Sequence, residues 1–168
     1  FYGIAALKPE NALNREVGLT WASGNQLASA TYFINTIEDM IVWSGRYVNV
    51  DKARIRGVTL AYALSIDSWD LAASADFLDT EDRKTGFQLG RRAKQTMNVS
   101  ATRTLGAWTL GGEWELVGSR YDTNSETSRL GGYGLVNMTA RYAIDRDWAL
   151  EARADNVFDK QYETARGY

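Results

Sequence analysis

The sequence WALEARADNVFDKQY, from Trp148 to Tyr162, decides the fold class. In its first half, apolar or small residues stand at the even positions, whereas Glu151, Arg153 and Asp155 stand at odd ones. A period of two is that of a β-strand, because a helix would spread these charged residues around its surface. The stretch therefore predicts a strand with one apolar and one charged face. The apolar face packs either against a soluble core or against lipid.

The same alternation recurs along the chain and predicts eight strands in four hairpins. The predicted strands are 17–21, 28–34, 58–66, 71–77, 97–102, 108–116, 136–142 and 148–157. Short turns are expected at 22–26, 67–68, 106–107 and 145–147, and long connections near 38–46, 79–91 and 122–132. Because short and long connections alternate, all short turns must lie at one end of the sheet.

One tryptophan stands beside each short turn, out of 6 in the chain: Trp21, Trp69, Trp108 and Trp148. A ring of indoles at one level of a sheet is typical of a membrane interface. Transmembrane barrels have strands of about 9 to 11 residues, with apolar side chains outside, short periplasmic turns and longer external loops. We therefore expect an all-β, antiparallel up-and-down transmembrane β-barrel. A soluble, lipocalin-like barrel has the same periodicity with the faces exchanged and stays an alternative.

The composition argues against several other classes of function. The chain has 168 residues and a net charge of −2, which gives no basic surface for nucleic acid. It contains no Cys and no His, so a disulfide framework, a thiolate metal site and the commonest general base are missing. We expect no catalytic residue, no metal site and no cofactor. The N-terminus lacks a signal-peptide pattern, so the chain is either cytosolic or a piece of a longer protein.

Two groups of carboxylates could in principle carry chemistry. Asp79, Glu81 and Asp82 offer oxygen ligands of the kind that calcium prefers, but an acidic cluster in a connection is usually only solvated. Glu113 and Glu115 share one face, as the two carboxylates of a glycosidase would, yet this spacing occurs in any polar wall. We expect neither calcium binding nor catalysis from them.

Several stretches carry a resemblance to a known family. They are LKPE at Leu7–Glu10, VDKARIRGV at Val50–Val58 and, above all, ARADNVFDKQYE at Ala152–Glu163. On these, the chain resembles the C-terminal barrel portion of TonB-dependent outer-membrane receptors. Further stretches are similar to the subgroup of vitamin B12 (cobalamin) receptors: LGRRAKQ at Leu89–Gln95, GSRYD at Gly118–Asp122 and YETARGY at Tyr162–Tyr168.

The resemblance implies that residues 1–168 are a single region, about eight strands of a barrel of roughly 22 in the Gram-negative outer membrane. It implies import of a corrinoid, driven by the TonB complex through a plug domain. We expect the plug and the final strand to be absent from this chain. A siderophore receptor of the same superfamily, and a passive or structural outer-membrane barrel, stay alternatives.

The resemblance also implies candidate ligand contacts. In cobalamin receptors, the first arginine of the RRAKQ pair contacts the ligand, and this role falls on Arg91. A guanidinium can donate several hydrogen bonds to a carbonyl-rich or phosphate-bearing ligand, although a solvated arginine at the rim stays the alternative. A second contact comes from the loop after the RYD match, where Ser125 is the candidate and Tyr121 is the nearest aromatic residue.

Overall fold

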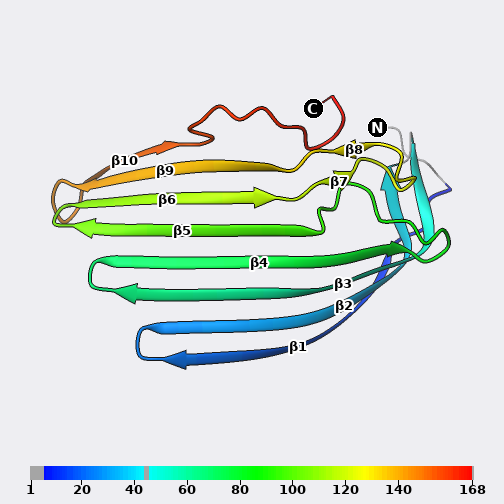
Figure 1. The fold of residues 1–168 in the computed structure, drawn as a ribbon, viewed down its shortest axis with the longest axis horizontal. Coiled ribbons are helices and arrows are strands. Elements are labelled where there is room, and N and C mark those ends of the chain that lie inside the picture. Colours follow the sequence, from blue (N-terminus) through cyan, green and yellow to red (C-terminus); the bar gives the residue numbers. More distant parts are fainter. Residues whose placement is uncertain (1–5, 44–45, 168) are drawn as a thin grey trace.

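The computed structural model describes residues 6–43 and 46–167, which form strands and connecting segments (Figure 1). Eight strands build one antiparallel sheet in the order β1-β2-β3-β4-β5-β6-β9-β10. They are β1 (Asn11–Ser23), β2 (Gln26–Trp43), β3 (Tyr47–Ile66), β4 (Trp69–Asp82), β5 (Gln95–Leu105), β6 (Trp108–Val117), β9 (Tyr133–Ala143) and β10 (Ala149–Ala154). A small second sheet pairs β7 (Arg120–Tyr121) with β8 (Arg129–Leu130). The described residues include no helix that could cross a membrane.

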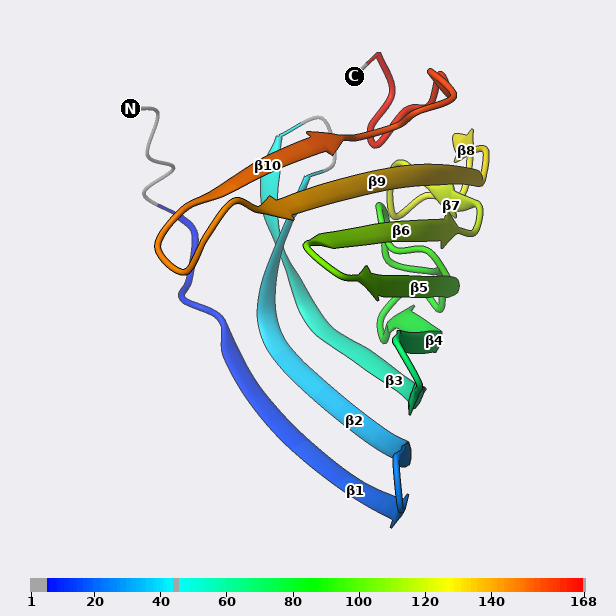
Figure 2. The ribbon, with the colours of Figure 1, turned by 90° about the vertical axis from the view of Figure 1, so that its left-hand side faces the viewer.

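The order of the strands confirms the predicted up-and-down topology, because the eight strands of the main sheet pair in the order in which they follow along the chain, with only the short β7 and β8 between β6 and β9. Figure 1 shows the short turns together at one end of the sheet, which we call the turn end. The longer connections, with β7 and β8, lie at the opposite end, which we call the loop end. The sheet is curved and open, with β1 and β10 at its two edges (Figure 2).

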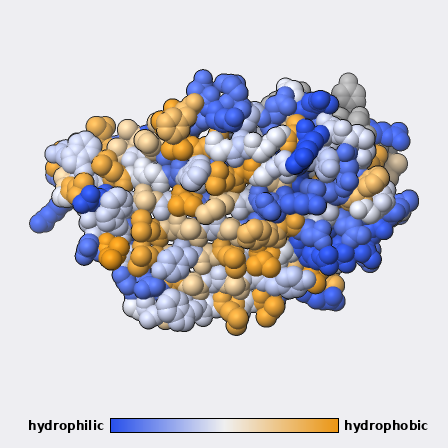
Figure 3. Space-filling view, in the orientation of Figure 1, coloured by the Kyte–Doolittle hydropathy of each residue, from blue (hydrophilic) through white to orange (hydrophobic). Residues whose placement is uncertain are grey.

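The strand registers confirm the predicted separation of faces. Leu60 of β3 lies between Ala30 of β2 and Ala75 of β4, and all three belong to what we call the apolar face. On the opposite, polar face, Thr59 lies beside Asp76 and donates a hydrogen bond from Oγ1 to Oδ1 at 2.6 Å. Hydrophobic side chains gather over the strands in Figure 3, whereas hydrophilic ones gather at the loop end.

Four tryptophans mark the turn end of the apolar face, as the sequence predicts. Trp21, Trp69, Trp108 and Trp148 are all exposed, and each lies at or within two residues of the end of a strand. The guanidinium of Arg103 lies over the ring of Trp69, 5.0 Å from its centroid. This contact keeps the charge of Arg103 at the level of the indoles, as expected for an arginine near the membrane interface that the sequence predicts.

Ion pairs border the apolar face at the loop end. On β4, Phe77 is the last apolar residue of this face, and Asp79 follows it. Arg56 of β3 donates to Asp79 at 2.6 Å, and Arg54 donates to Glu81 at 2.6 Å. We call these two pairs the ion-pair rows. On β3 and β4 the apolar face therefore ends at paired charges toward the loop end, and an indole lies at its turn end.

The loop-end halves of several strands extend beyond their predicted bounds. Strands β2 and β3 stay paired up to Trp43 and Tyr47, so the long connection predicted at 38–46 is wrong, and its residues 44–45 lie outside the described part. Likewise, β4 continues beyond its predicted end at Phe77 to Asp82, and β5 begins at Gln95, before its predicted start at Met97. In these extensions, charged residues stand on the face that is apolar nearer the turn end. The alternation of apolar and polar residues that marks a half-buried strand is therefore lost there.

The C-terminal strand is shorter than predicted, because β10 ends at Ala154. Asn156 adopts a positive φ of 49° and reverses the chain, which Asn tolerates better than most residues. Its side chain accepts a hydrogen bond from the Lys160 amide at 2.9 Å and donates one to the Lys160 carbonyl at 3.1 Å. Asn137 of β9 accepts a hydrogen bond from the Asn156 amide at 2.9 Å. The NVFDK segment is therefore a turn fastened to the sheet.

Candidate functional site

The predicted ligand contacts lie in two connecting segments that pack together at the loop end. These are residues 83–94, between β4 and β5, and residues 118–132, between β6 and β9. Leu89 in the first segment is fully buried against a cluster that contains Ile37 and Ala53 of the extended β2–β3 hairpin. The longer strands that the sequence did not reveal thus provide the support on which this loop rests.

Side chains of the second segment hold the backbone of the first. The Gly90 amide donates to Oδ1 of Asn124 at 2.6 Å, and the Gln88 amide donates to Oε1 of Glu126 at 2.6 Å. A Cβ atom on Gly90 would lie 2.9 Å from the backbone of Thr123, so this approach requires glycine. These hydrogen bonds join residues 34 and 38 positions apart in sequence, so the two segments form one structural unit, which we call the loop cluster.

Arg91 is fixed in this loop cluster by its backbone and by its side chain. Its φ is 58°, and its amide donates to the carbonyl of Tyr121 at 2.6 Å. Its Nε donates to Oδ1 of the buried Asp122 at 2.9 Å, while 44% of the Arg91 side chain stays exposed. The guanidinium is therefore oriented by a carboxylate and still reaches solvent, as a ligand contact requires.

The other two candidates lie in the same cluster, in different surroundings. Tyr121 is half-buried and lines a cavity, so its position is set by packing as well as by its backbone. Ser125 is exposed, and its hydroxyl lies 2.8 Å from that of Thr123 and 3.0 Å from that of Thr127. The structure thus brings Arg91 and Tyr121 into contact and leaves Ser125 at the tip of the second segment.

Arg92, the second arginine of the RRAKQ pair, has a different environment from Arg91. Arg92 is half-buried, and burial lowers the pKa of its guanidinium below the usual value of arginine. Its Nη1 donates to the carbonyl of Gly90 at 3.3 Å. Arg92 therefore helps to shape the loop, and the exposed donor of the pair is Arg91.

The sequence reasoning missed Arg120, which is buried in the same cluster with an exposed fraction of 6%. Its Nη2 donates to the carbonyl of Glu163 at 2.7 Å, and its guanidinium lies 5.4 Å from the centroid of the Tyr133 ring. An arginine in the GSRYD stretch was visible, but no pattern in sequence indicates that it would be buried. Arg120 ties the C-terminal segment to the loop cluster.

The acidic residues predicted to be solvated in a connection are instead paired. Asp79 and Glu81 belong to the ion-pair rows on β4, and Asp82 accepts backbone hydrogen bonds from Lys84 and Thr85. Within residues 6–43 and 46–167, no group of acidic residues could hold a metal ion. These carboxylates stabilise the loop end of the β3–β4 hairpin.

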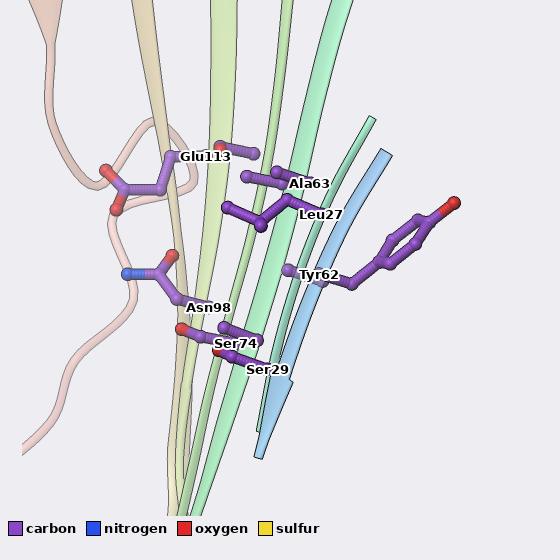
Figure 4. Close-up of a pocket in the computed structure, with 11 residues that line it drawn as sticks. Leu27, Ser29, Tyr62, Ala63, Ser74, Asn98 and Glu113 are labelled. Carbon is purple, nitrogen blue, oxygen red and sulfur yellow. The ribbon is translucent and has the colours of Figure 1, made fainter. Parts of the chain in front are cut away.

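A second cavity, of about 320 Å³, lies on the polar face and is lined by residues of the five strands from β2 to β6 (Figure 4). Mostly small side chains line it, together with Asn98 and Glu113. Figure 4 shows Tyr62 pointing to the opposite side of the sheet. Glu113 and Glu115 both belong to the polar face, but Glu113 is bonded to Asn137 at 3.5 Å, and Ser100 lies opposite it. The cavity is a hollow in the polar face of the sheet.

Comparison with known proteins identifies the family. Residues 1–157 match the family described as TonB dependent receptor-like, beta-barrel. The chain belongs to this family of TonB-dependent receptor barrels. Proteins of this family are β-barrels of the Gram-negative outer membrane, so the predicted fold class and location are confirmed and the soluble lipocalin-like alternative is excluded.

Two similar proteins are each named Vitamin B12 transporter BtuB. The protein from Photobacterium profundum is 29% identical over 176 residues, which cover 99% of this chain and 29% of that protein. The protein from Vibrio vulnificus is 29% identical over 170 residues, covering 97% of this chain and 27% of that protein. The chain therefore spans less than a third of the length of these relatives.

Solved structures of TonB-dependent receptors share the fold at lower identity. The ferric yersiniabactin uptake receptor FyuA from Yersinia pestis matches with a TM-score of 0.78 and 20% identity, over 93% of this chain and 26% of that one. Copper transporter OprC matches with a TM-score of 0.77 and 22% identity, over 95% of this chain and 26% of that one. The open sheet therefore has the shape of one arc of such a barrel.

Proposed function

We propose that this chain forms part of the barrel of an outer-membrane receptor that imports cobalamin with energy from the TonB complex. The observation that carries the proposal is the match of nearly the whole chain, at 29% identity, to two proteins named as vitamin B12 transporters. The structural neighbours transport other cargoes and support only the shared fold. The siderophore receptor is therefore the second candidate.

The loop cluster supports a role in binding a large polar ligand. Arg91 offers guanidinium N–H groups beyond the Nε that Asp122 engages, and its exposed position lets them reach a ligand above the sheet. Because Asp122 and the Tyr121 carbonyl already hold Arg91 in place, little conformational entropy remains to be lost on binding. Arg91 is the contact we propose first, with Tyr121 and Ser125 as further candidates.

The apolar face fits the hydrocarbon region of a membrane. From Trp69 to Asp79 the strand rises about 33 Å at about 3.3 Å per residue, which a tilt of about 40° reduces to a height of about 25 Å. This equals the apolar band of outer-membrane barrels, whose girdles are aromatic. We assign the tryptophans to the periplasmic boundary and the ion-pair rows to the outer one.

The polar face would then line the lumen of the complete barrel. Its mostly small side chains around the cavity of about 320 Å³ leave space for a plug domain contributed by the rest of the protein. We propose that TonB acts through that plug, and that this part of the barrel serves as wall and loop support.

Uptake of radiolabelled cyanocobalamin tests the proposal in cells whose only cobalamin receptor is the full-length protein. We expect accumulation that requires an intact TonB and falls to background when TonB is deleted. Accumulation that persists without TonB would indicate a passive barrel. Growth on a ferric siderophore without any cobalamin uptake would favour the siderophore receptor.

A further inference from the structure

A polar cavity of about 330 Å³ lies at the loop end, beside β7 and β8. Four parts of the chain form it: the 83–94 connection, the start of β5, the segment after β6, and the β7–β8 pair, which Figure 1 shows at the loop end. Its volume is at the lower end of the range for small-molecule sites. Arg91 and the cavity of the polar face are not part of its lining, whereas Tyr121 is.

The lining of this cavity carries positive charge without a compensating carboxylate. Its charged residues are Lys94, Arg120 and Arg129, and the described lining contains no aspartate or glutamate. Arg129 donates from Nε and Nη2 to the hydroxyl of Ser119, at 3.2 and 2.7 Å, and Lys94 is exposed. None of the three cations forms an ion pair within the described part of the chain.

Two carboxylates of the loop cluster already have hydrogen-bond partners. Asp122 pairs with Arg91 at 2.9 Å, and Glu126 accepts the amide hydrogen bond of Gln88 at 2.6 Å. In the described ranges, neither carboxylate forms an ion pair with Lys94, Arg120 or Arg129.

Arg120 gives the strongest indication of a ligand. It is more than nine-tenths buried, and its Nη1 finds no hydrogen-bond partner among the residues that the structure describes. The other contacts of its guanidinium are neutral: the carbonyl of Glu163, and Tyr133, whose ring and hydroxyl both lie beside it. A buried guanidinium without a counter-charge is costly, so such a group normally has an anionic partner.

We propose that this cavity binds an oxyanion, a phosphate group held by Lys94, Arg120 and Arg129. Two arginines supply planar donors that suit phosphate oxygens, and the lysine adds a mobile point charge at the mouth. Ser119 and Gln88 offer neutral hydrogen-bonding groups to the same space. The phosphate belongs either to a soluble ligand or to the headgroup of a lipid, and it does not depend on cobalamin being the cargo.

Calorimetric titration of the full-length receptor with inorganic pyrophosphate in a neutral detergent tests the site. We expect saturable binding, weakened about tenfold or more by Lys94→Gln, because a charge-assisted hydrogen bond is lost. Lys94 is exposed, so this variant should fold even if Arg120→Gln does not. The matched control is Arg103→Gln at the turn end, which should leave pyrophosphate binding unchanged.

Mixed micelles containing dioleoyl phosphatidic acid distinguish the two sources of phosphate. If the lipid displaces pyrophosphate from the receptor but not from Lys94→Gln, the site accepts a lipid headgroup. If only soluble pyrophosphate binds, the site takes the phosphate of a soluble ligand. Absence of saturable binding by both probes would overturn the proposal, as would equal weakening by Lys94→Gln and Arg103→Gln.

Discussion

Arg91 donates a hydrogen bond from Nε to Oδ1 of Asp122 at 2.9 Å, joining two connections of the barrel that are 31 residues apart in sequence. The carboxylate is nearly buried, with 11% of its side chain exposed, whereas the guanidinium is partly in solvent. The pair therefore has two possible uses, to order the loop cluster and to present the guanidinium to a ligand.

Substitutions at both partners separate these uses. Arg91→Ala should weaken cyanocobalamin binding to the full-length receptor by about 1.5 to 3 kcal/mol, the value of a charge-assisted hydrogen bond. Asp122→Asn keeps an acceptor for Nε and leaves the guanidinium in place, so binding should change by less than about 1 kcal/mol. Equal losses in equilibrium binding by the two variants would show that Arg91 acts only by ordering the loop.

Arginine substitutions on adjacent residues test the assignment of faces. Leu60→Arg places a charge on the apolar face near the middle of the band and should destabilise the inserted barrel by about 2 to 4 kcal/mol. Ala61→Arg, one residue further on, points into the cavity of the polar face and should cost less. The comparison uses urea unfolding of the barrel in lipid vesicles; a larger cost for Ala61→Arg would contradict the proposed orientation.

Gly57 is a position where the sheet has no room for a side chain. A Cβ atom there would lie 2.5 Å from the carbonyl oxygen of Phe77 and 2.8 Å from Cδ2 of Leu78. Gly57→Ala should therefore destabilise the barrel by about 1 to 3 kcal/mol, because backbone must move. Gly112 is the control, since nothing lies within 4 Å of a Cβ built on it. The two unfolding midpoints in urea should differ, and equal midpoints would refute the predicted clash.

Asn156 is expected to hold the turn after β10 through both its backbone and its side chain. Asn156→Ala loses the two hydrogen bonds to Lys160 and places alanine at a φ of 49°, whereas Asn156→Gly loses only the hydrogen bonds. Hydrogen exchange of residues 157–163 should accelerate in both variants, and more in the alanine variant by about 1 kcal/mol. Identical exchange in alanine and glycine variants would show that the backbone conformation is unimportant.

The sequence predicts the strands wherever one face is apolar. Between Trp69 and Phe77 the alternation is clear, and the faces and pairing follow from it. Above this level Arg54 and Arg56 replace the apolar residues, so the extended hairpin of β2 and β3 has no periodic signal. Strands of two residues, such as β7, are too short to show any period.

The candidate site could be predicted only in part. The RRAKQ stretch pointed to Arg91, but its pairing with Asp122 joins distant segments that no local pattern relates. The burial of Arg120 likewise depends on the return of the C-terminal segment to the loop cluster through Glu163. Contacts of this kind follow from the packing of loops on a finished sheet.

Equilibrium binding of cyanocobalamin to the purified full-length receptor tests the central claim most directly. Titration in detergent, with a ferric siderophore as the comparison ligand, should give saturable binding of cyanocobalamin and none of the siderophore. Saturable binding of the siderophore without binding of cyanocobalamin, by a receptor that is folded and inserted, would contradict the proposed function.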